Sequence, residues 1–361
     1  MLSIGLDGHQ RLYVLCIGDG SGRILERRTI RGDWRQLIGF LRSLATPFQI
    51  VYEASSGSGF LYDRLKTIAR RIVVAHPGHL RLIFKAKRKN DRVDAEKLYK
   101  LLLLDAVPAV YVPTPAVRDW RKLIEFRSRL VAKRTRVKNA IRALLKDHGL
   151  EAPKRGTLWT TKGIAWLREL TLETHLASLQ RDMLLDEHDA HDEKIKRLER
   201  ELDAVAADHA GAQLLRTIPG VGPRTSEAVM AAIDDPRRFR RNKAIGAYFG
   251  LVPCQDESAG KARFGHVTRE GPATVRRLLT EAAWQGIRRS DRIRAFYEQV
   301  KHDDPQRNKI ALVATAHHLA KIMLSMLKSG EVWHEEPRST TRGRSVPNPA
   351  RGRGGRNHDV T

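Results

Sequence analysis

The amino-acid sequence predicts a mixed α/β domain at the N-terminus, then a long basic helical region with coiled-coil character, and finally a mainly α-helical C-terminal domain. Short apolar runs bounded by turn-forming residues occupy much of positions 3–75 and are typical of strands. From about residue 33 these runs alternate with helical patterns, which indicates a sheet covered by helices. Beyond residue 117 the apolar residues recur at helical spacing instead.

The first strands form a predicted hairpin. Residues 3–17 read as two strands joined by the polar turn Asp7–Arg11, and residues 24–30 as a third strand with alternating character. The elements expected next are, in order, a helix over 33–44 with an Asp33 N-cap, a strand over 49–53, a helix over 60–70, a strand over 71–75, and a helix that starts near Lys89 and runs toward Leu104.

The later part of the chain is predicted to be mostly helical. The expected elements are a very basic helix over 117–146, a loop over 151–162, a helix over 166–179, a charged helix over 184–207, a polar loop over 254–271, and helices over 272–289 and 310–328. The apolar residues of 184–207 lie near a heptad seam, so both antiparallel packing within the chain and dimerisation stay open. Residues 337–361 lack any apolar period and are expected to be a disordered basic tail.

Composition narrows the class of partner. The 361-residue chain has a formal net charge of +25 and a pI near 10.5, which indicates a polyanion and first of all nucleic acid. We expect no membrane span, because the apolar runs read as shorter than the roughly 18 residues required, and the stretch Met1–Asp7 does not resemble a signal peptide. Cys16 and Cys254 are too few for a disulfide framework or a zinc site.

Four carboxylates are candidate metal ligands. Asp91 and Asp94 are three residues apart and therefore share one face of the predicted helix, in a cationic stretch that also holds Lys85, Lys87, Arg88, Lys89 and Arg92. Asp7 and Glu53 lie at the ends of predicted strands, where ligands of α/β sheets gather. The set suits a divalent metal beside a phosphate backbone. The alternative is a solvated acidic pair in a first helical turn, with the other two carboxylates structural.

Two basic features are candidate nucleic-acid contacts. In the helix over 117–146, positive residues far outnumber acids, which indicates a face that binds nucleic acid. The alternative is an amphipathic helix with an ordinary solvated face. Its candidate contacts are Arg121, Lys122, Arg129, Lys133 and Arg136. The stretch Ile218–Thr225 has the apolar-x-Gly-x-Gly pattern of a helix-hairpin-helix, in which Gly220 and Gly222 allow a tight turn and Arg224 follows. A plain connector between helices is the alternative.

Ser258 is a candidate nucleophile. Cations follow it closely in the sequence, namely Lys261, Arg263, His266, Arg269, Arg276 and Arg277. A serine hydroxyl attacks phosphorus only when cations stabilise the developing charge and a base accepts its proton. A loop serine that bonds its own backbone is the alternative.

Five local matches, in this order along the chain, together resemble the DEDD insertion-sequence transposases. They are Ile4–Asp7, Tyr52–Ala54, Lys89–Ala95, Ile218–Pro223, and Gly250–Pro253 followed by Ser258, Gly260, Lys261 and Gly265. Members of that family are recombinases with a RuvC-like (RNase H-like) N-terminal domain and a serine-bearing C-terminal transposase domain.

The resemblance implies a specific site and assembly. It implies a Mg²⁺-binding tetrad of Asp7, Glu53, Asp91 and Asp94, with Ser258 as the nucleophile. It also implies a dimer or tetramer of protomers around donor and target DNA, guided by a structured noncoding RNA from the element itself. The domains expected are a RuvC-like catalytic domain with the basic helix over 1–150, a coiled-coil-like linker over 151–210, a serine transposase domain over 211–335 and the basic tail over 336–361.

The functional hypothesis is therefore RNA-guided DNA strand cleavage and exchange through a phosphoserine intermediate, in a prokaryotic cytoplasm beside the nucleoid. Two alternatives belong to other classes. One is a metal-dependent, junction-resolvase-like nuclease that needs the carboxylates but uses water in place of Ser258. The other is a non-catalytic nucleic-acid-binding scaffold that keeps the fold for its charge and shape.

Overall fold

The computed structural model describes residues 1–83, 90–151, 153, 156–258 and 261–335. The chain divides into two compact units, Met1–Trp120 and the part from Arg121 onward. The predicted basic tail and the cationic stretch from Lys85 to Lys89 lie outside the described residues.

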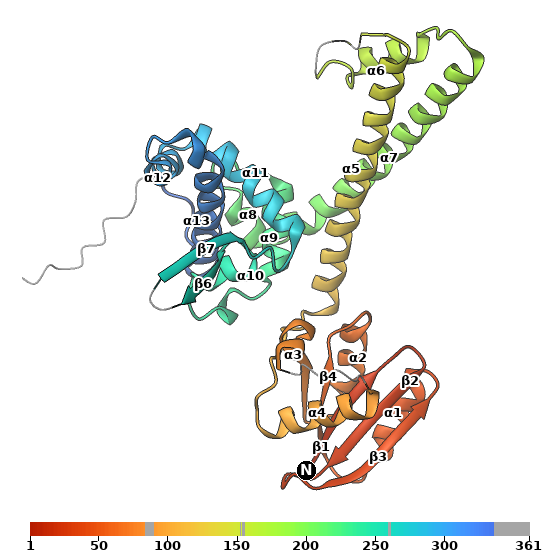
Figure 1. Cartoon of the computed structure of the whole chain (residues 1–361), viewed down its shortest axis with the longest axis vertical. Coiled ribbons are helices and arrows are strands. Elements are labelled where there is room, and N and C mark those ends of the chain that lie inside the picture. The colour runs from red at the N-terminus through yellow and green to blue at the C-terminus, as the bar shows by residue number, and fades with distance from the viewer. Residues whose placement is uncertain (84–89, 152, 154–155, 259–260, 336–361) are drawn as a thin grey trace, which may run out of the picture. The chain divides into compact units, whose positions relative to one another are not determined.

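The first unit is built on a five-stranded mixed sheet with the order β3-β2-β1-β4-β5 (Figure 1). The antiparallel strands β1 (Leu2–Gly8), β2 (Leu12–Gly18) and β3 (Ile24–Arg31) confirm the predicted hairpin and third strand. β4 (Phe48–Glu53) runs parallel to β1, and β5 (Arg71–Ala75) parallel to β4. This mixed sheet is consistent with an RNase H-like fold.

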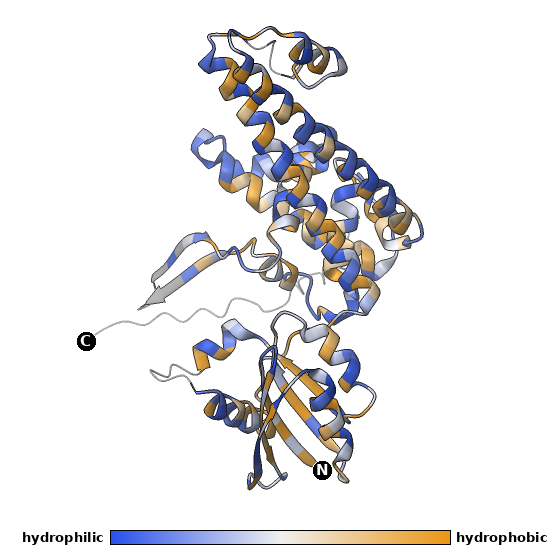
Figure 2. Cartoon of the chain, turned by 90° about the vertical axis from the view of Figure 1, so that its right-hand side faces the viewer, coloured by the Kyte–Doolittle hydropathy of each residue, from blue (hydrophilic) through white to orange (hydrophobic). Residues whose placement is uncertain are grey.

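Helices cover the two faces of this sheet. Alternation along β1 turns Ile4 and Leu6 into the core shared with α1 (Trp34–Ser43) and α2 (Ser58–Leu65). The opposite face, which includes Val51, packs against α4 (Asp91–Leu103). Figure 2 shows much of the sheet as hydrophobic, as expected where helices cover both faces, whereas the edge strand β3 is mostly exposed. The predicted Asp33 N-cap is present, since its side chain accepts from the N–H of Arg35 within a capping box.

Two details of the first unit differ from the sequence predictions. The helix expected over 60–70 begins at Ser58 and ends at Leu65, because the N–H groups of Ile68 and Ala69 both turn back to the Leu65 carbonyl. That turn lets Arg70 donate to the Phe48 carbonyl and feeds the chain into β5. A short helix that was not predicted, α3 (Pro77–Ile83), follows β5.

The second unit begins with two long antiparallel helices, α5 (Pro115–Asp147) and α7 (His175–Ala207), with α6 (Thr161–Glu169) between them. α5 starts in the first unit and continues into the second at Arg121. Part of the heptad-like seam of α7 packs within the chain, since Leu185 belongs to the same apolar cluster as Val137 and Ile141 of α5. Antiparallel packing within the chain is therefore present, and dimerisation is not tested by this contact. The prediction of one continuous helix over 166–179 is wrong. The chain is non-helical between α6 and α7, and Thr174 caps a new helix by accepting from the Ala177 N–H.

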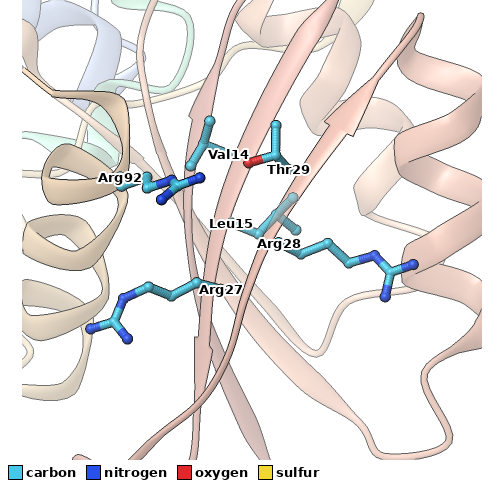
Figure 3. Close-up of a pocket in the computed structure, with 6 residues that line it drawn as sticks. All are labelled: Val14, Leu15, Arg27, Arg28, Thr29 and Arg92. Atoms are coloured by element: carbon cyan, nitrogen blue, oxygen red, sulfur yellow. The ribbon is translucent and has the colours of Figure 1, made fainter.

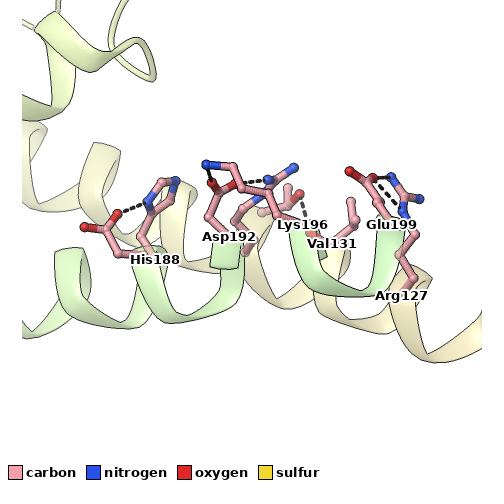
Figure 4. Close-up of polar contacts among 9 residues, drawn as sticks. Arg127, Val131, His188, Asp192, Lys196 and Glu199 are labelled. Carbon is pink, nitrogen blue, oxygen red and sulfur yellow. Dashed lines mark hydrogen bonds and ion pairs between the residues drawn. The ribbon is translucent and has the colours of Figure 1, made fainter. Parts of the chain in front are cut away.

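Ion pairs set the register of α5 against α7 (Figure 4). Arg127 pairs with Glu199 and Arg134 with Asp192, so positions seven apart on one helix meet positions seven apart on the other. Lys196 also binds Asp192, with 2.9 Å between Nζ and Oδ2. Each such pair contributes at most about 1 kcal/mol, so the apolar core around Ile141, Leu145, Leu167 and Leu185 supplies most of the stability.

The rest of the second unit is a helical body with one hairpin. Its helices are α8 (Ala210–Leu215), α9 (Pro223–Ile233), α10 (Ala244–Tyr248), α11 (Ala273–Arg289), α12 (Asp291–Lys301) and α13 (Asn308–Ser329), with short 3₁₀ turns at Pro236–Arg238 and Pro305–Arg307. The predicted polar loop over 254–271 is instead mostly a β-hairpin of β6 (Pro253–Ser258) and β7 (Lys261–Val267). Ser290 caps α12, a helix that was not predicted.

α13 corrects the expectation that no apolar run is long enough to span a membrane. Within Pro305–Ser329, a window of 18 residues has a mean hydropathy of 1.5 and meets the length and composition of a span, although 44% of that window is buried inside the protein. Ala311, Thr315, Leu319 and Met323 are among its buried residues, and α13 packs against α8, α10, α11 and α12. This pattern is typical of the core helix of a folded domain.

A substitution at Gly5 tests the packing of α4 on the sheet. A Cβ at Gly5 would lie 2.0 Å from the Ala95 carbonyl oxygen and 2.5 Å from the Tyr99 nitrogen, both backbone atoms that cannot move independently. We expect Gly5→Ala to destabilise the first unit by about 3 kcal/mol. Urea unfolding, with hydrogen–deuterium exchange resolved for β1 and α4, measures the effect.

Gly39→Ala is the matched control for Gly5→Ala. Gly39 lies in α1 with no atom within 4 Å of an added Cβ, so alanine there should be neutral or stabilise the helix by up to about 1 kcal/mol. Equal stability of the two variants would contradict the assigned packing.

Candidate functional site

Asp7 and Glu53 lie at the carboxyl ends of neighbouring parallel strands. β1 and β4 pair in register up to Leu6 and Tyr52, so Asp7 and Glu53 occupy the next positions. Both side chains belong to the face opposite Leu6 and Tyr52, since alternate residues of a strand point to opposite faces. That is the face on which α4 packs.

A glycine brings α4 unusually close to this face. Gly5 has no side chain, and the backbone of α4 occupies the space that a Cβ would fill. Asn90 caps α4 by accepting from the Arg92 N–H, so the helix starts at Asp91 and carries Asp91 and Asp94 in its first turn. The helix dipole favours carboxylates at this end. The close approach therefore delivers two acids to the end of β1.

Asp7 and Asp91 meet at a third residue, His9. The Nε2 atom of His9 lies 3.7 Å from Oδ2 of Asp7 and 3.7 Å from Oδ2 of Asp91. One ligand atom from each of the three residues lies within 4.8 Å of the others. His9 was not among the predicted site residues. The available signal was its place two residues after Asp7, just past the end of the same strand.

Glu53 and Asp94 lie outside this three-residue group. Glu53 is exposed at the end of β4. Asp94 is half-buried, and its Oδ1 accepts a hydrogen bond of 2.9 Å from Lys97 Nζ on the same helix. The structure thus brings two of the four predicted carboxylates into direct proximity. Glu53 lies at the end of the adjacent strand β4, and Asp94 lies about one helical turn after Asp91 on α4.

The donor set suits a divalent cation. Carboxylate oxygens are the ligands that Mg²⁺ and Mn²⁺ prefer, and an imidazole nitrogen adds affinity for transition metals. Asp7, His9 and Asp91 offer two oxygens and one nitrogen from a rigid strand end and a helix start. These residues therefore fit a metal such as the DEDD nuclease-like families usually use.

Three of the predicted nucleic-acid contacts are used inside the second unit. Arg121 donates to the carbonyls of Ala231 and Ala232 at 2.6 and 2.9 Å. Arg224 pairs with Asp203 and Glu227. Arg276 donates to the carbonyls of Phe249, Glu270 and Gly271. These guanidinium groups stabilise the local fold, a role that was not predicted from the sequence.

The other predicted contacts with described side chains are exposed. Lys122, Arg129, Lys133 and Arg136 are exposed on α5, as are Arg263 on β7 and Arg277 on α11. Arg277 also pairs with Glu281 at 2.8 Å. Ser258 is the last residue of β6 and pairs in register with Lys261, the first residue of β7.

Gly220 serves packing within the turn between α8 and α9. It has a φ of +91°, and a Cβ there would lie 2.5 Å from the Gly286 nitrogen of α11. Gly222 is the N-cap of α9, and its carbonyl accepts from Thr225 and Ser226. The two glycines thus allow a tight turn that lies against α11.

Glu227 is a buried acid beside Arg224. It is 1% exposed, and burial raises its pKa to about 7, although Arg224 and Arg127 oppose that rise. Arg224 Nη1 lies 3.4 Å from Glu227 Oε1. Asp203 and Glu199 of α7 add negative charge nearby and favour the protonated form. This cluster links the long helices to α9.

Models of known protein families match parts of both units. Residues 4–149 match the model of the DEDD transposases of the IS110 type, described as "Transposase", and residues 212–298 match "Transposase IS116/IS110/IS902 family". The chain is 28% identical to a probable family 20 transposase of Pseudomonas aeruginosa, over 90% of this chain and 92% of the relative. It is also 28% identical to the transposase for insertion sequence element IS1111A of Coxiella burnetii, over 78% of this chain and 76% of the relative. A similar match, 28% identical over 78% of this chain and 82% of the relative, is the transposase for insertion sequence element IS1328 of Yersinia enterocolitica.

Metal binding tests the three-residue group. We expect Asp91→Asn to lower the affinity for both Mg²⁺ and Mn²⁺ at least about tenfold, since it removes a charged ligand. We expect His9→Ala to weaken Mn²⁺ binding more than Mg²⁺ binding, because an imidazole nitrogen suits the transition metal better. Isothermal titration calorimetry measures both.

Glu26→Gln, at an exposed acid of β3, is the control for metal binding and should leave both affinities unchanged. An unaltered Mg²⁺ affinity in Asp91→Asn would show that Asp91 is not a ligand.

The raised pKa of Glu227 predicts a pH dependence of stability. The folded pKa, about 7, exceeds the ordinary value of 4.5, so the folded state binds the proton more tightly than the unfolded state. Stability of the second unit should therefore be highest below about pH 4.5 with respect to this group and fall as the pH rises to about 7. The change is on the order of 3 kcal/mol, at about 1.4 kcal/mol per pKa unit.

Glu227→Gln should remove most of this slope, because the amide does not ionise. Denaturant unfolding of both proteins between pH 5 and pH 8 gives the comparison. Identical slopes in the two proteins would contradict the assignment of the pH dependence to Glu227.

Proposed function

Because the chain belongs to the DEDD insertion-sequence transposases of the IS110 family, we propose that it cuts DNA strands and rejoins them through a serine-linked intermediate. The observation that carries the first half of the proposal is the convergence of Asp7 and Asp91 at the end of β1. Two like charges this close repel each other, and a bound cation would remove that repulsion.

The four carboxylates would hold the metal. We propose Asp7 and Asp91 as direct ligands, with Glu53 and Asp94 completing the set when the metal and the strand bind. Lys97, which binds Asp94 in this structure, would then release or share that carboxylate. Mg²⁺ is the proposed ion, and when bound it would neutralise the scissile phosphate and stabilise the leaving oxygen.

Ser258 would be the nucleophile. Its Oγ forms a bond to phosphorus while the bond from phosphorus to the sugar oxygen of the leaving strand breaks. The hydroxyl proton passes to a nearby base, and the freed sugar oxygen takes up a proton. The phosphoserine ester keeps the bond energy, so a second strand end can attack it and release Ser258. Lys261, Arg263 and His266 are the nearest basic residues in sequence.

The carboxylates and Ser258 belong to separate units, so the reaction requires a serine unit to close over the metal site. We propose that this unit comes from the same chain or from another protomer of a dimer or tetramer. The proposed domains are the catalytic domain over 1–150, the helical linker over 151–210 and the serine domain over 211–335.

The nucleic acids are proposed to lie on exposed cationic surfaces. Lys122, Arg129, Lys133 and Arg136 on α5 would contact phosphates of DNA and of a guide RNA that pairs with donor and target. The segment from α8 through Gly220 and Gly222 to α9 would act as a helix-hairpin-helix, whose backbone N–H groups face a phosphate. The substrate implies action in the cytoplasm, beside the nucleoid.

A pair of substitutions separates strand transfer from simple hydrolysis. We expect Ser258→Ala to abolish the covalent protein–DNA adduct that forms on a nicked substrate carrying the ends of the element. Asp7→Ala should abolish both the adduct and strand cutting, because it removes the metal site. Adducts are counted after denaturing electrophoresis, and the attachment point is mapped by mass spectrometry of the peptide that contains Ser258.

Ser43→Ala, at an exposed serine of α1, is the control for this experiment and should form the adduct normally. Strand cutting by Ser258→Ala at the normal rate, with no adduct in the unsubstituted protein, would favour a nuclease that uses water. Wild-type activity in Asp7→Ala would exclude the metal site.

A further inference from the structure

A small groove lies beside the carboxylates on the first unit (Figure 3). Its volume is about 150 Å³, and it is lined by Val14, Leu15, Arg27, Arg28, Thr29 and Arg92. It extends from β2 and β3 to the start of α4. The proposed function assigns no role to these residues.

Residues of the groove neighbour residues of the metal site on both the sheet and the helix. Asp7 pairs in register with Val14, and Val14 pairs with Thr29. Directly paired residues point to the same face, so the three form one row across β1, β2 and β3. At about 4.8 Å between strands, Thr29 lies roughly 10 Å from Asp7. Arg92 follows Asp91 on α4 and bounds the groove from the other side.

The groove presents donors that lack acceptors. Among the described residues, the Arg92 guanidinium and the Thr29 hydroxyl have no side-chain partner, and both side chains are exposed. Figure 3 shows Arg92 reaching from α4 toward Val14 and Thr29. Arg27 is held by Glu96 at 2.8 Å, and Lys100 binds the same carboxylate at 2.8 Å. Arg27, Lys100, Arg92 and Glu96 together leave a surplus of positive charge.

These donors match a phosphodiester. A guanidinium and a hydroxyl are common partners of the phosphate oxygens of nucleic acid. β3 is an edge strand, and Arg27 and Thr29 are exposed on it, so a polymer can pass along the groove without being enclosed. A strand whose phosphate reaches Asp7 and Asp91 would place a neighbouring phosphate over this row.

We propose that Arg92 and Thr29 form a subsite for a phosphate of the DNA strand that the carboxylates act on, flanking the scissile phosphate. The subsite rests on the proposed function, since it positions the strand for that metal site. Arg92 reaches the phosphate from α4 and Thr29 from β3, with Arg27 adding positive charge. The subsite holds the strand in register with Asp7 and Asp91.

Disulfide cross-linking tests the subsite without requiring strand cutting. For this experiment, Cys254→Ser is introduced into the full-length protein, because the exposed thiol of Cys254 would also react. Cys16 is buried and is kept. Thr29→Cys in this background is mixed with a single-stranded oligo-dT in which one phosphate bears a disulfide tether. We expect cross-linking at least about tenfold faster than for Ser43→Cys, an exposed position on α1. Equal rates at the two positions would overturn the proposal.

A second comparison tests whether the fast cross-linking at Thr29→Cys depends on Arg92. Arg92→Ala in the Thr29→Cys background should slow cross-linking severalfold, because the phosphate loses its guanidinium partner. Arg42→Ala, at an exposed arginine of α1, lowers the net charge equally and should leave the rate unchanged. Equal rates in the two variants would overturn the proposal, as would faster reaction of a tethered oligo-U, which would assign the groove to RNA.

Strand cutting is measured separately with the unsubstituted protein and the ends of the element. Cutting without selective cross-linking at Thr29→Cys would reject the subsite and leave the proposed function intact. Selective cross-linking without cutting would reject the proposed function and leave a DNA-binding groove.

Discussion

The contact between Gly5 on β1 and the backbone of α4 is the constraint on which the candidate site depends. Any side chain at position 5 would collide with Ala95 and Tyr99 and lift the helix away from the sheet. With the helix seated, its first turn carries Asp91 to Asp7, and His9 lies between them. A backbone contact thus sets the distance between carboxylates that are far apart in sequence. The groove between β3 and Arg92 depends on the same contact, because it lies between the sheet and α4.

The basic residues of the second unit fall into two groups. Some form contacts within the fold, and others stay exposed to solvent. Arg127 and Arg134 pair with α7 and fix the register of the two long helices, while Arg121 and Arg224 close the junction with α9. Basic residues on the remaining faces of α5 stay exposed. One very basic helix therefore has two roles, because only one of its faces is covered by a partner helix. The basic residues of α5 that remain accessible to a nucleic acid are those outside the covered face.

Local signals predicted the elements of the first unit well. Alternation and turn residues defined β1 to β5, and the predicted N-cap Asp33 is present in the structure. The predictions were wrong where a tertiary contact overrides local pattern. The helix expected over 166–179 is interrupted, and Arg181 donates to the Leu170 carbonyl across the interruption. The polar stretch after Pro253 pairs with itself as β6 and β7, although its composition is that of a loop.

For the site, the sequence by itself determined which side chains are available. The ordered motifs around Asp7, Glu53, Asp91 and Ser258 are local patterns, and their residue types and order are sufficient to indicate the family. The tertiary structure alone decided which groups meet. It placed His9 between Asp7 and Asp91 and used Arg224 and Arg276 inside the fold. The reason is physical: identity and spacing act along the chain, whereas proximity depends on how closely a helix and a sheet pack, in this protein through Gly5.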